Sequence, residues 1–436
     1  MKNLRKLLAL VMAVTMLIGM FSFANAEDEK IKLIFMYSFE EQMRPPIHAV
    51  VEQFMIDNPN IEVECVFGGS YTESNTRLLA AHAAALQGDK AGYPAIHQTE
   101  AAQLATFAEN GVIAPLNDLI ANANFPIEDY FTGMVAAYSY DGLCYGIPAV
   151  ASLCPTMYYN KTLCEEVNAP FPTTWDEVGA WLEKVTVKDE QGNTVRYGMA
   201  LAGWFETYWA PFFWQNGAVP FLDEECTQVA FTSEAAIETT KMFKEWIDKG
   251  YVKWCNGPNA SANMRQSLID GTSMCVSHTC SVFSVYQPAL AANGWELGIA
   301  FPPAGVKAQA QLAGAGFTVT SQLSDAEKEA AFKLIAALTA PEANIAMVTA
   351  TGYLPTSKQA LESEACATWI ATYPELQNLY DHLQSIEGPN QHPLWNEIST
   401  KWGDALTLIF NDGADLESTL AAAEEECNEL LEEYNE

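Results

Sequence analysis

The sequence predicts an α/β protein of two lobes, and three observations support this fold class. The chain has 436 residues, more than one hydrophobic core usually supports, so at least two domains are expected. After a leader it begins with a strand, an amphipathic helix and a second strand, an order typical of a parallel sheet. Residues 138–161 combine a tight-turn signal with an extended apolar run, and the rest of the chain divides most simply into a lobe on either side.

The first 26 residues are typical of a secretory signal peptide. A basic start precedes an apolar run over residues 7–23, and Ala24-Asn25-Ala26 has the pattern of a cleavage site. An uncleaved membrane anchor is the alternative, which the shortness of the apolar run disfavours. No cysteine ends this run, so a lipid anchor is not expected. We expect export to the periplasmic or extracellular face, and no later segment is long and apolar enough to span a bilayer.

The charge balance restricts the partners. The chain has 22 lysines and arginines against 55 aspartates and glutamates, a formal net charge of −33, and cleavage of the leader would remove three more basic groups. Such a surface repels phosphate backbones and anionic lipid, because like charges repel at close range. Nucleic acid is therefore excluded as a partner.

The first lobe is predicted from alternating strand and helix signals. Residues 31–37 and 61–66 are expected to be strands, because they are short and rich in apolar and β-branched residues. Residues 40–57 place apolar side chains at helical spacing and end before Asn58-Pro59, a stop signal. The elements expected next are a helix at 76–86 and a short helix at 103–110.

The middle of the chain predicts a hairpin followed by an extended segment. Asp141-Gly142 tolerates the positive φ of a tight turn. Pro148 removes a backbone donor and favours extended geometry before it, and an apolar run continues to Tyr159. From the residues alone this run fits equally well a crossing between the lobes and an edge strand.

The second half continues the α/β pattern. Residues 233–249 form a strongly amphipathic helix with Ser233 as its N-cap and Gly250 past its end. Residues 203–217 hold seven aromatic side chains, some of which must belong to a core. The other expected elements are a helix at 175–185, strands at 195–200 and 312–319, and an acidic helical tail from about residue 357.

The ten cysteines carry little functional information. An even number in an exported chain permits disulfides, and Cys144 and Cys154 flank the extended segment, but connectivity cannot be deduced from the sequence. No CxxC or Cys/His metal spacing occurs, and His278 has no second histidine at ligand spacing. We expect no metal and no cofactor, and most of the cysteines are predicted to be small buried apolar residues.

Three motifs resemble those of one protein family. Gly146-Ile147-Pro148, then residues 157–161 (MYYNK), then residues 172–178 (PTTWDEV) are similar to the "G-x-P … YYNK … P-x-T-W-x-E" run of the family 1 extracellular solute-binding proteins of ABC importers. The resemblance continues over nearly all of residues 31–436. It implies the periplasmic-binding-protein fold, two α/β lobes with mixed sheets joined by crossing hinge segments, and it favours the crossing interpretation of the middle segment.

The resemblance also implies lobe boundaries. The N-terminal lobe would comprise residues 27–140 plus about 305–345. The C-terminal lobe would comprise about 150–300 plus about 346–436, including the helical tail. Such proteins close on a ligand by hinge motion.

Candidate ligand-binding residues follow from the branch that takes up sn-glycerol-3-phosphate and its diesters. Its Gly-Ser-Tyr-x-Glu pattern places Tyr71 toward the ligand, against the alternative of a loop aromatic, and Glu100 matches a ligand-facing glutamate, against an exposed helix-start residue. Thr279 or Ser281 would supply a hydroxyl, and Tyr353 belongs to the family's "T-G-Y-L-P".

Further candidates come from their positions in the predicted elements. Ser152 lies where the second lobe is expected to start, and Gly314 lies in a glycine-rich strand that allows close backbone approach. Trp204 follows directly after a predicted strand, and its ring could stack on the apolar face of a sugar. Trp209 or Tyr208 is a less favoured platform.

The expected solute is neutral. An arginine that meets phosphate in the tail of the related branch has no counterpart in residues 387–392 (EGPNQH), and charge-assisted pairing is what makes phosphate recognition strong. We expect a monomer that binds a sugar or polyol and docks on ABC permease subunits. The alternatives are binding of sn-glycerol-3-phosphate or its diesters, and a secreted glycoside hydrolase, although no G-x-S-x-G, P-loop or H-E-x-x-H motif occurs.

Overall fold

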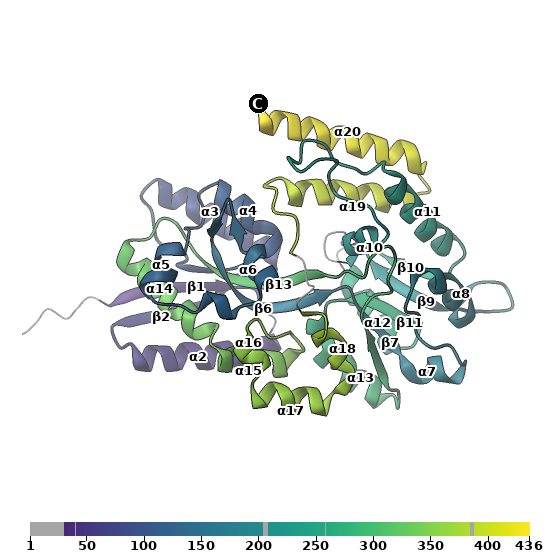
Figure 1. Ribbon diagram of the computed structural model, residues 1–436, viewed down its shortest axis with the longest axis horizontal. Helices are drawn as coiled ribbons and strands as arrows, with labels where there is room; N and C mark the ends of the chain where they lie inside the picture. The colour runs from purple at the N-terminus through teal and green to yellow at the C-terminus, as the bar shows by residue number, and fades with distance from the viewer. Residues whose placement is uncertain (1–29, 40, 204–207, 258, 384–387) are drawn as a thin grey trace, which may run out of the picture.

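Two α/β lobes lie side by side and are connected by strands that run between them (Figure 1). The computed structural model describes residues 30–436 apart from 40, 204–207, 258 and 384–387. The two-lobed fold class expected from the sequence is confirmed, with one mixed sheet in each lobe.

The N-terminal lobe is built on a five-stranded mixed sheet. Its order is β2 (Ile61–Phe67), β1 (Ile31–Tyr37), β3 (Ile96–Glu100), β13 (Gln311–Val319) and β6 (Gly146–Cys154). Strand β1 runs parallel to β2 and β3, and helices provide the long connections that parallel strands need. Strand β13 is antiparallel to both β3 and β6, so residues more than 150 positions apart share one sheet.

The C-terminal lobe has its own mixed sheet. Its order is β10 (Val252–Cys255), β9 (Thr194–Ala202), β11 (Ser273–His278), β7 (Thr156–Asn160) and β12 (Leu297–Ala300). Strand β9 is parallel to β10 and β11, whereas β7 is antiparallel to β11 and β12. The short strand β8 (Val187–Lys188) pairs with β9 at the side of the sheet.

Helices cover both sheets, and a helical tail extends over both lobes (Figure 1). The helices of the N-terminal lobe are η1 (Glu41–Met43), α2 (Arg44–Asp57), α3 (Tyr71–Leu86), α4 (Ala101–Glu109), α5 (Asn117–Asn122), η2 (Ile127–Asp129), α6 (Thr132–Ala137) and α14 (Asp325–Leu338). Those of the C-terminal lobe are α7 (Lys161–Glu166), α8 (Trp175–Val185), α10 (Ala210–Gln215), α11 (Glu234–Asp248), α12 (Ala260–Ile269), η3 (Cys280–Val282) and α13 (Phe283–Ala292). Helix α15 (Pro341–Thr351) follows α14 and packs against α2 and η1. The tail contains α16 (Lys358–Leu361), α17 (Glu364–Thr372), η4 (Pro374–Leu376), α18 (Gln377–Tyr380), α19 (Trp395–Asn411) and α20 (Leu416–Asn435).

Strands β6 and β13 form the connection between the lobes. They pair from Gly146 opposite Thr318 to Cys154 opposite Gln311. Strand β6 is the last strand of the N-terminal sheet, so the two interpretations of this segment, crossing and edge strand, both describe it. The predicted hairpin before it is also present, as β4 (Ser139–Tyr140) paired with β5 (Leu143–Cys144).

The hydrophobic core changes along these two strands. Val150 and Ala315 belong to a hydrophobic cluster of the N-terminal lobe, whereas Leu153 and Leu312 belong to a larger cluster that fills the C-terminal lobe and also includes N-terminal residues such as Leu104. Each strand therefore leaves one core and enters the other within a few residues. The lobe boundaries taken from the sequence stay a prediction.

Gly314 lies where the two strands pass between the cores, and its backbone requires glycine. Its φ is +122°, a conformation that L side chains rarely adopt. A Cβ atom there would lie 2.2 Å from the carbonyl oxygen of Val150 on the paired strand, and the register shifts by one residue just after it. The close approach of β6 is thus a sufficient reason for glycine at position 314, without any role in ligand binding.

Two further expectations can be compared with the described residues. None of the ten cysteines is disulfide-bonded, and eight of them, including Cys144 and Cys154, are buried. Over the residues described, no single helix has the length and apolarity to cross a membrane; a bent pair, Asp325–Leu338 with Pro341–Thr351, satisfies both criteria only when its two helices are combined.

Replacing Gly314 with alanine should lower the free energy of unfolding by about 3 kcal/mol, because the new Cβ both strains the backbone and meets the Val150 carbonyl. Urea denaturation measures this loss. Gly192→Ala is the matched control, since Gly192 has φ +86° but nothing within 4 Å of its added Cβ, so only about 1 kcal/mol should be lost. Equal losses in the two variants would show that the interstrand contact is unimportant.

Candidate functional site

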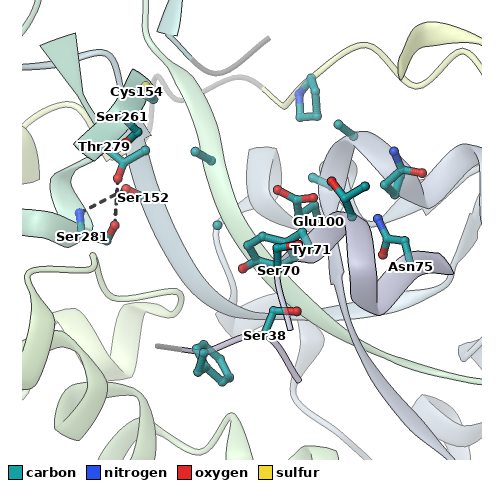
Figure 2. Close-up of a pocket in the computed structure, with 18 of the residues that line it drawn as sticks. Ser38, Ser70, Tyr71, Asn75, Glu100, Ser152, Cys154, Ser261, Thr279 and Ser281 are labelled. Atoms are coloured by element: carbon teal, nitrogen blue, oxygen red, sulfur yellow. Dashed lines mark hydrogen bonds between the residues drawn. The ribbon is translucent and has the colours of Figure 1, made fainter. Parts of the chain in front are cut away.

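A cavity of about 940 Å³ lies between the lobes and is lined by both of them. The N-terminal lobe contributes the ends of β1 and β3 and the first turns of α3 and α4, and the C-terminal lobe contributes α12 and the segment after β11. The paired strands β6 and β13 pass along the cavity (Figure 2). Six of the eight residues selected from the sequence line it: Tyr71, Glu100, Ser152, Thr279, Gly314 and Tyr353.

Tyr71 is held by the N-terminus of α3. The helix begins at Tyr71, five residues earlier than expected, because Ser70 and Glu73 form a capping box: the Glu73 N–H donates to Ser70 Oγ at 3.3 Å, and the Ser70 N–H donates to Glu73 Oε2 at 2.8 Å. The Tyr71 hydroxyl accepts a hydrogen bond of 2.7 Å from the amide of Gln98 on β3. The ring is thereby fixed at the cavity wall.

Glu100 and Tyr353 lie near the hydroxyl of Tyr71. Burial raises the pKa of Tyr71 well above its ordinary value, and the neighbouring Tyr353 and Glu100 raise it further. Glu100 is the last residue of β3 and the N-cap position of α4, where the backbone changes from extended to helical. The N-terminal lobe therefore presents the protonated phenol of Tyr71 beside the carboxyl group of Glu100 (Figure 2).

Hydroxyl groups gather on the other side of the cavity (Figure 2). The oxygens of Thr279 and Ser281 are 2.8 Å apart, so both positions between which the sequence left a choice are present in the wall. Ser152 on β6 joins them: its Oγ accepts from the Ser281 N–H at 3.4 Å and lies 3.3 Å from Cys280 Sγ. Small alcohols that bond to one another can exchange these bonds for bonds to a hydroxylated ligand.

Of the two tryptophans selected from the sequence as ligand platforms, only one lies among the described residues. Trp204 lies outside the described residues. Trp209 is fully buried, its indole N–H donates to the Ala202 carbonyl at 2.8 Å, and its ring packs against Phe243 with centroids 4.5 Å apart. The prediction of a ligand platform at Trp209 is wrong for this structure, because a ring with no exposed surface cannot stack on a solute. Tyr208, the alternative, does line the cavity.

Sequence reasoning missed a polar cluster on the C-terminal wall. Ser261 and Arg265 lie one turn apart on α12 and both line the cavity. Ser261 Oγ is 3.2 Å from Nε2 of His278, and the Tyr208 hydroxyl is 3.4 Å from the same nitrogen. The i, i+4 spacing of Ser261 and Arg265 was the available signal, but nothing in the sequence indicates which face of α12 meets the cavity.

His278 is neutral in the folded protein. Burial lowers its pKa to about 3, and the positive charge of Arg265 acts in the same direction. Within the described part of the chain, no group of three or more histidine, cysteine or acidic side chains is arranged to hold a metal ion. His278 therefore belongs to a hydrogen-bonding cluster in this structure.

Comparison with known proteins shows that the chain matches one protein family. The model of the bacterial extracellular solute-binding proteins matches residues 49–378 of the chain. The chain belongs to this family. The resemblance inferred from the motifs is thus confirmed, and the members of the family bind solutes.

Individual relatives have low sequence identity to this chain but match it over most of its length. A Brucella abortus protein named only as a binding protein is 25% identical over 338 residues, which cover 75% of this chain and 77% of the relative. The GacH receptor of Streptomyces glaucescens, solved without ligand and with acarbose, has a TM-score of 0.79 at 18% identity over 92% of this chain and 99% of that one. UgpB from Mycobacterium tuberculosis, solved with glycerophosphocholine, has a TM-score of 0.77 at 22% identity over the same shares. These structural likenesses show the fold.

The neutral state of His278 makes stability depend on pH. Its pKa is about 3 when folded and about 6.5 when unfolded, so the unfolded chain takes up a proton first as the pH falls, and stability is lost below pH 6.5. Between pH 7.5 and pH 5.0 the wild type should lose about 2 kcal/mol more than His278→Gln. Urea denaturation at the two pH values measures the difference, and equal losses would mean that His278 is not protonated on unfolding.

Proposed function

We propose that this protein captures a sugar or related polyol outside the cytoplasmic membrane and delivers it to the permease of an ABC importer. The observation that carries the proposal is the cavity of about 940 Å³ between the lobes, whose walls present hydroxyl, phenol and carboxyl groups. A hydroxylated solute needs many hydrogen-bond partners and an apolar surface for its C–H face, and both are available here.

The solute would bridge the two lobes. On one side Tyr71 and Glu100 would accept and donate hydrogen bonds, and on the other Ser152, Thr279 and Ser281 would do the same. A ligand that contacts both walls binds the closed arrangement more tightly than the open one, so it shifts the population toward closure. The strands β6 and β13, which pass between the two cores, are the segments about which the lobes would turn.

An aromatic ring on each side would hold the solute. Tyr71 supplies the ring of the N-terminal lobe. Trp204 remains the predicted ring of the C-terminal lobe and lies outside the described residues. Tyr208 lines the described part of that wall, although only 2% of its surface is exposed, so its hydroxyl edge is what a ligand would meet.

The number of carboxyl groups in the described lining of the cavity favours binding over glycoside hydrolysis. Most glycoside hydrolases need two carboxyl groups that flank the scissile bond. Among the described residues that line the cavity, Glu100 alone carries a carboxyl group. We therefore propose that the protein has no hydrolase activity.

The leader at residues 1–26 would direct export of the protein, and the mature protein would act as a monomer.

A titration with neutral sugars and polyols tests this function. Isothermal calorimetry with glucose, maltose, ribitol and glycerol should find at least one that binds, and Tyr71→Phe should weaken that binding about tenfold, because a buried hydrogen bond to the solute is lost. Tyr251→Phe, outside the cavity, is the matched control and should bind as the wild type does. Product formation on maltose would instead support the hydrolase alternative.

Closure of the two lobes can be measured separately from ligand binding. Small-angle X-ray scattering should show a smaller radius of gyration at saturating ligand than without it, since the lobes approach one another around the solute. A mixture with a sugar that does not bind in calorimetry serves as the control. An unchanged radius at saturation would contradict closure while leaving binding intact.

A further inference from the structure

Arg265 places a positive charge in the cavity. It lies on α12 and lines the cavity, and its side chain is half-buried. Within the described lining, Arg265 and Glu100 are the two residues that carry a formal charge at neutral pH in an ordinary environment, since His278 is neutral. The remaining polar groups are hydroxyls, amides and backbone atoms.

Packing directs this arginine toward the cavity. Met264 and Leu268, one turn apart on α12, are fully buried in the core of the C-terminal lobe. Arg265 and Ser261 form the adjacent i, i+4 stripe of the same helix, and this stripe faces the cavity. The helix cannot turn Arg265 away without exposing its apolar side.

The guanidinium group has no hydrogen-bond or ion-pair partner among the described residues. The other three described arginines, Arg44, Arg77 and Arg196, each donate to a backbone carbonyl. The described ion pairs all involve lysine. Among the described arginines, Arg265 is therefore the one whose guanidinium has no acceptor within the described residues, and it lies in the cavity.

The groups around Arg265 are suited to an anion. The Thr279 N–H donates to Nδ1 of the neutral His278 ring, so Nε2 carries the proton and faces the hydroxyls of Ser261 and Tyr208, which can in turn donate to an anion. No carboxyl group of the C-terminal lobe lines the described part of the cavity. The carboxyl group of Glu100 belongs to the other lobe, and Figure 2 shows it on the side away from Ser261 and Thr279.

We propose that Arg265 binds an anionic group of the solute. The solute would then be a sugar or polyol that carries a carboxylate or a phosphate, with this group at Arg265 and its hydroxyls toward Glu100 and Tyr71. Guanidinium groups bind carboxylate and phosphate through paired hydrogen bonds, and a half-buried cation gains most when an anion neutralises it. The inference rests on the proposed function and reverses the expectation of a neutral solute, which relied on residues 387–392 alone.

The two charges also give the solute a direction. Glu100 repels an anion, whereas Arg265 attracts it, so an anionic sugar would enter with its charge toward the C-terminal lobe. The net charge of −33 disfavours anions at the outer surface, and the positive charge of Arg265 opposes this repulsion inside the cavity. Selectivity for an anion should therefore depend on this single side chain.

Matched pairs of compounds test the proposal. Calorimetry at low salt should compare glucose with glucuronate, glucose with glucose 6-phosphate, and glycerol with sn-glycerol 3-phosphate. In at least one pair the anionic member should bind at least about tenfold more tightly, and the pair that does so distinguishes carboxylate from phosphate. Arg265→Gln should abolish this preference, whereas Arg265→Lys should retain part of it.

A control variant tests whether the anion preference comes from Arg265 itself or from any positive charge on the same lobe. Lys253→Gln removes one positive charge from the same lobe outside this cavity, and it should keep the full anion preference. Neutral members that bind as tightly as their anionic partners, or an anion preference that survives Arg265→Gln, would overturn the inference and leave the proposed function standing. Binding by none of the compounds, charged or neutral, would overturn the proposed function and this inference together.

Discussion

The pairing of β6 with β13 is the constraint on which the rest of the structure depends. These strands come from positions more than 150 residues apart, complete the N-terminal sheet and continue into the C-terminal core. Because both strands pass between the lobes together, they fix where the lobes meet and leave the space beside them open as a cavity. Gly314 shows how close this pairing is, since its missing side chain makes room for the Val150 carbonyl.

The cavity walls have different chemistry because they come from different elements. The N-terminal wall uses the end of β3 and the first turn of α3, where Gln98 and the Ser70–Glu73 capping box hold Tyr71. The C-terminal wall uses the segment after β11 and one face of α12, which bring hydroxyls, a neutral imidazole and a guanidinium together. A solute that satisfies both walls stabilises the closed form, which is the physical basis of capture.

Several elements were predictable because their signals are local. The helix at Trp175–Val185 begins and ends at the predicted residues, and Asp141-Gly142 does form the turn of a hairpin. The start of α3 was placed at residue 76 rather than at Tyr71, because the prediction followed the alanine-rich run and missed the capping box ahead of it. Cap residues decide a helix end by satisfying free backbone donors, a more precise signal than composition.

Taken by itself, the sequence determined the two-lobed α/β class, the family, and six residues that line one cavity, because strand and helix signals and short motifs are encoded by neighbouring residues. Only the tertiary structure decided that Trp209 is buried in the core and that Arg265 lies in the cavity. Both depend on which face of an element packs inward, and that choice is made by residues distant in the chain. A hydrophobic pattern indicates which face of a helix or strand is buried in the core, but it does not indicate what the opposite face contacts.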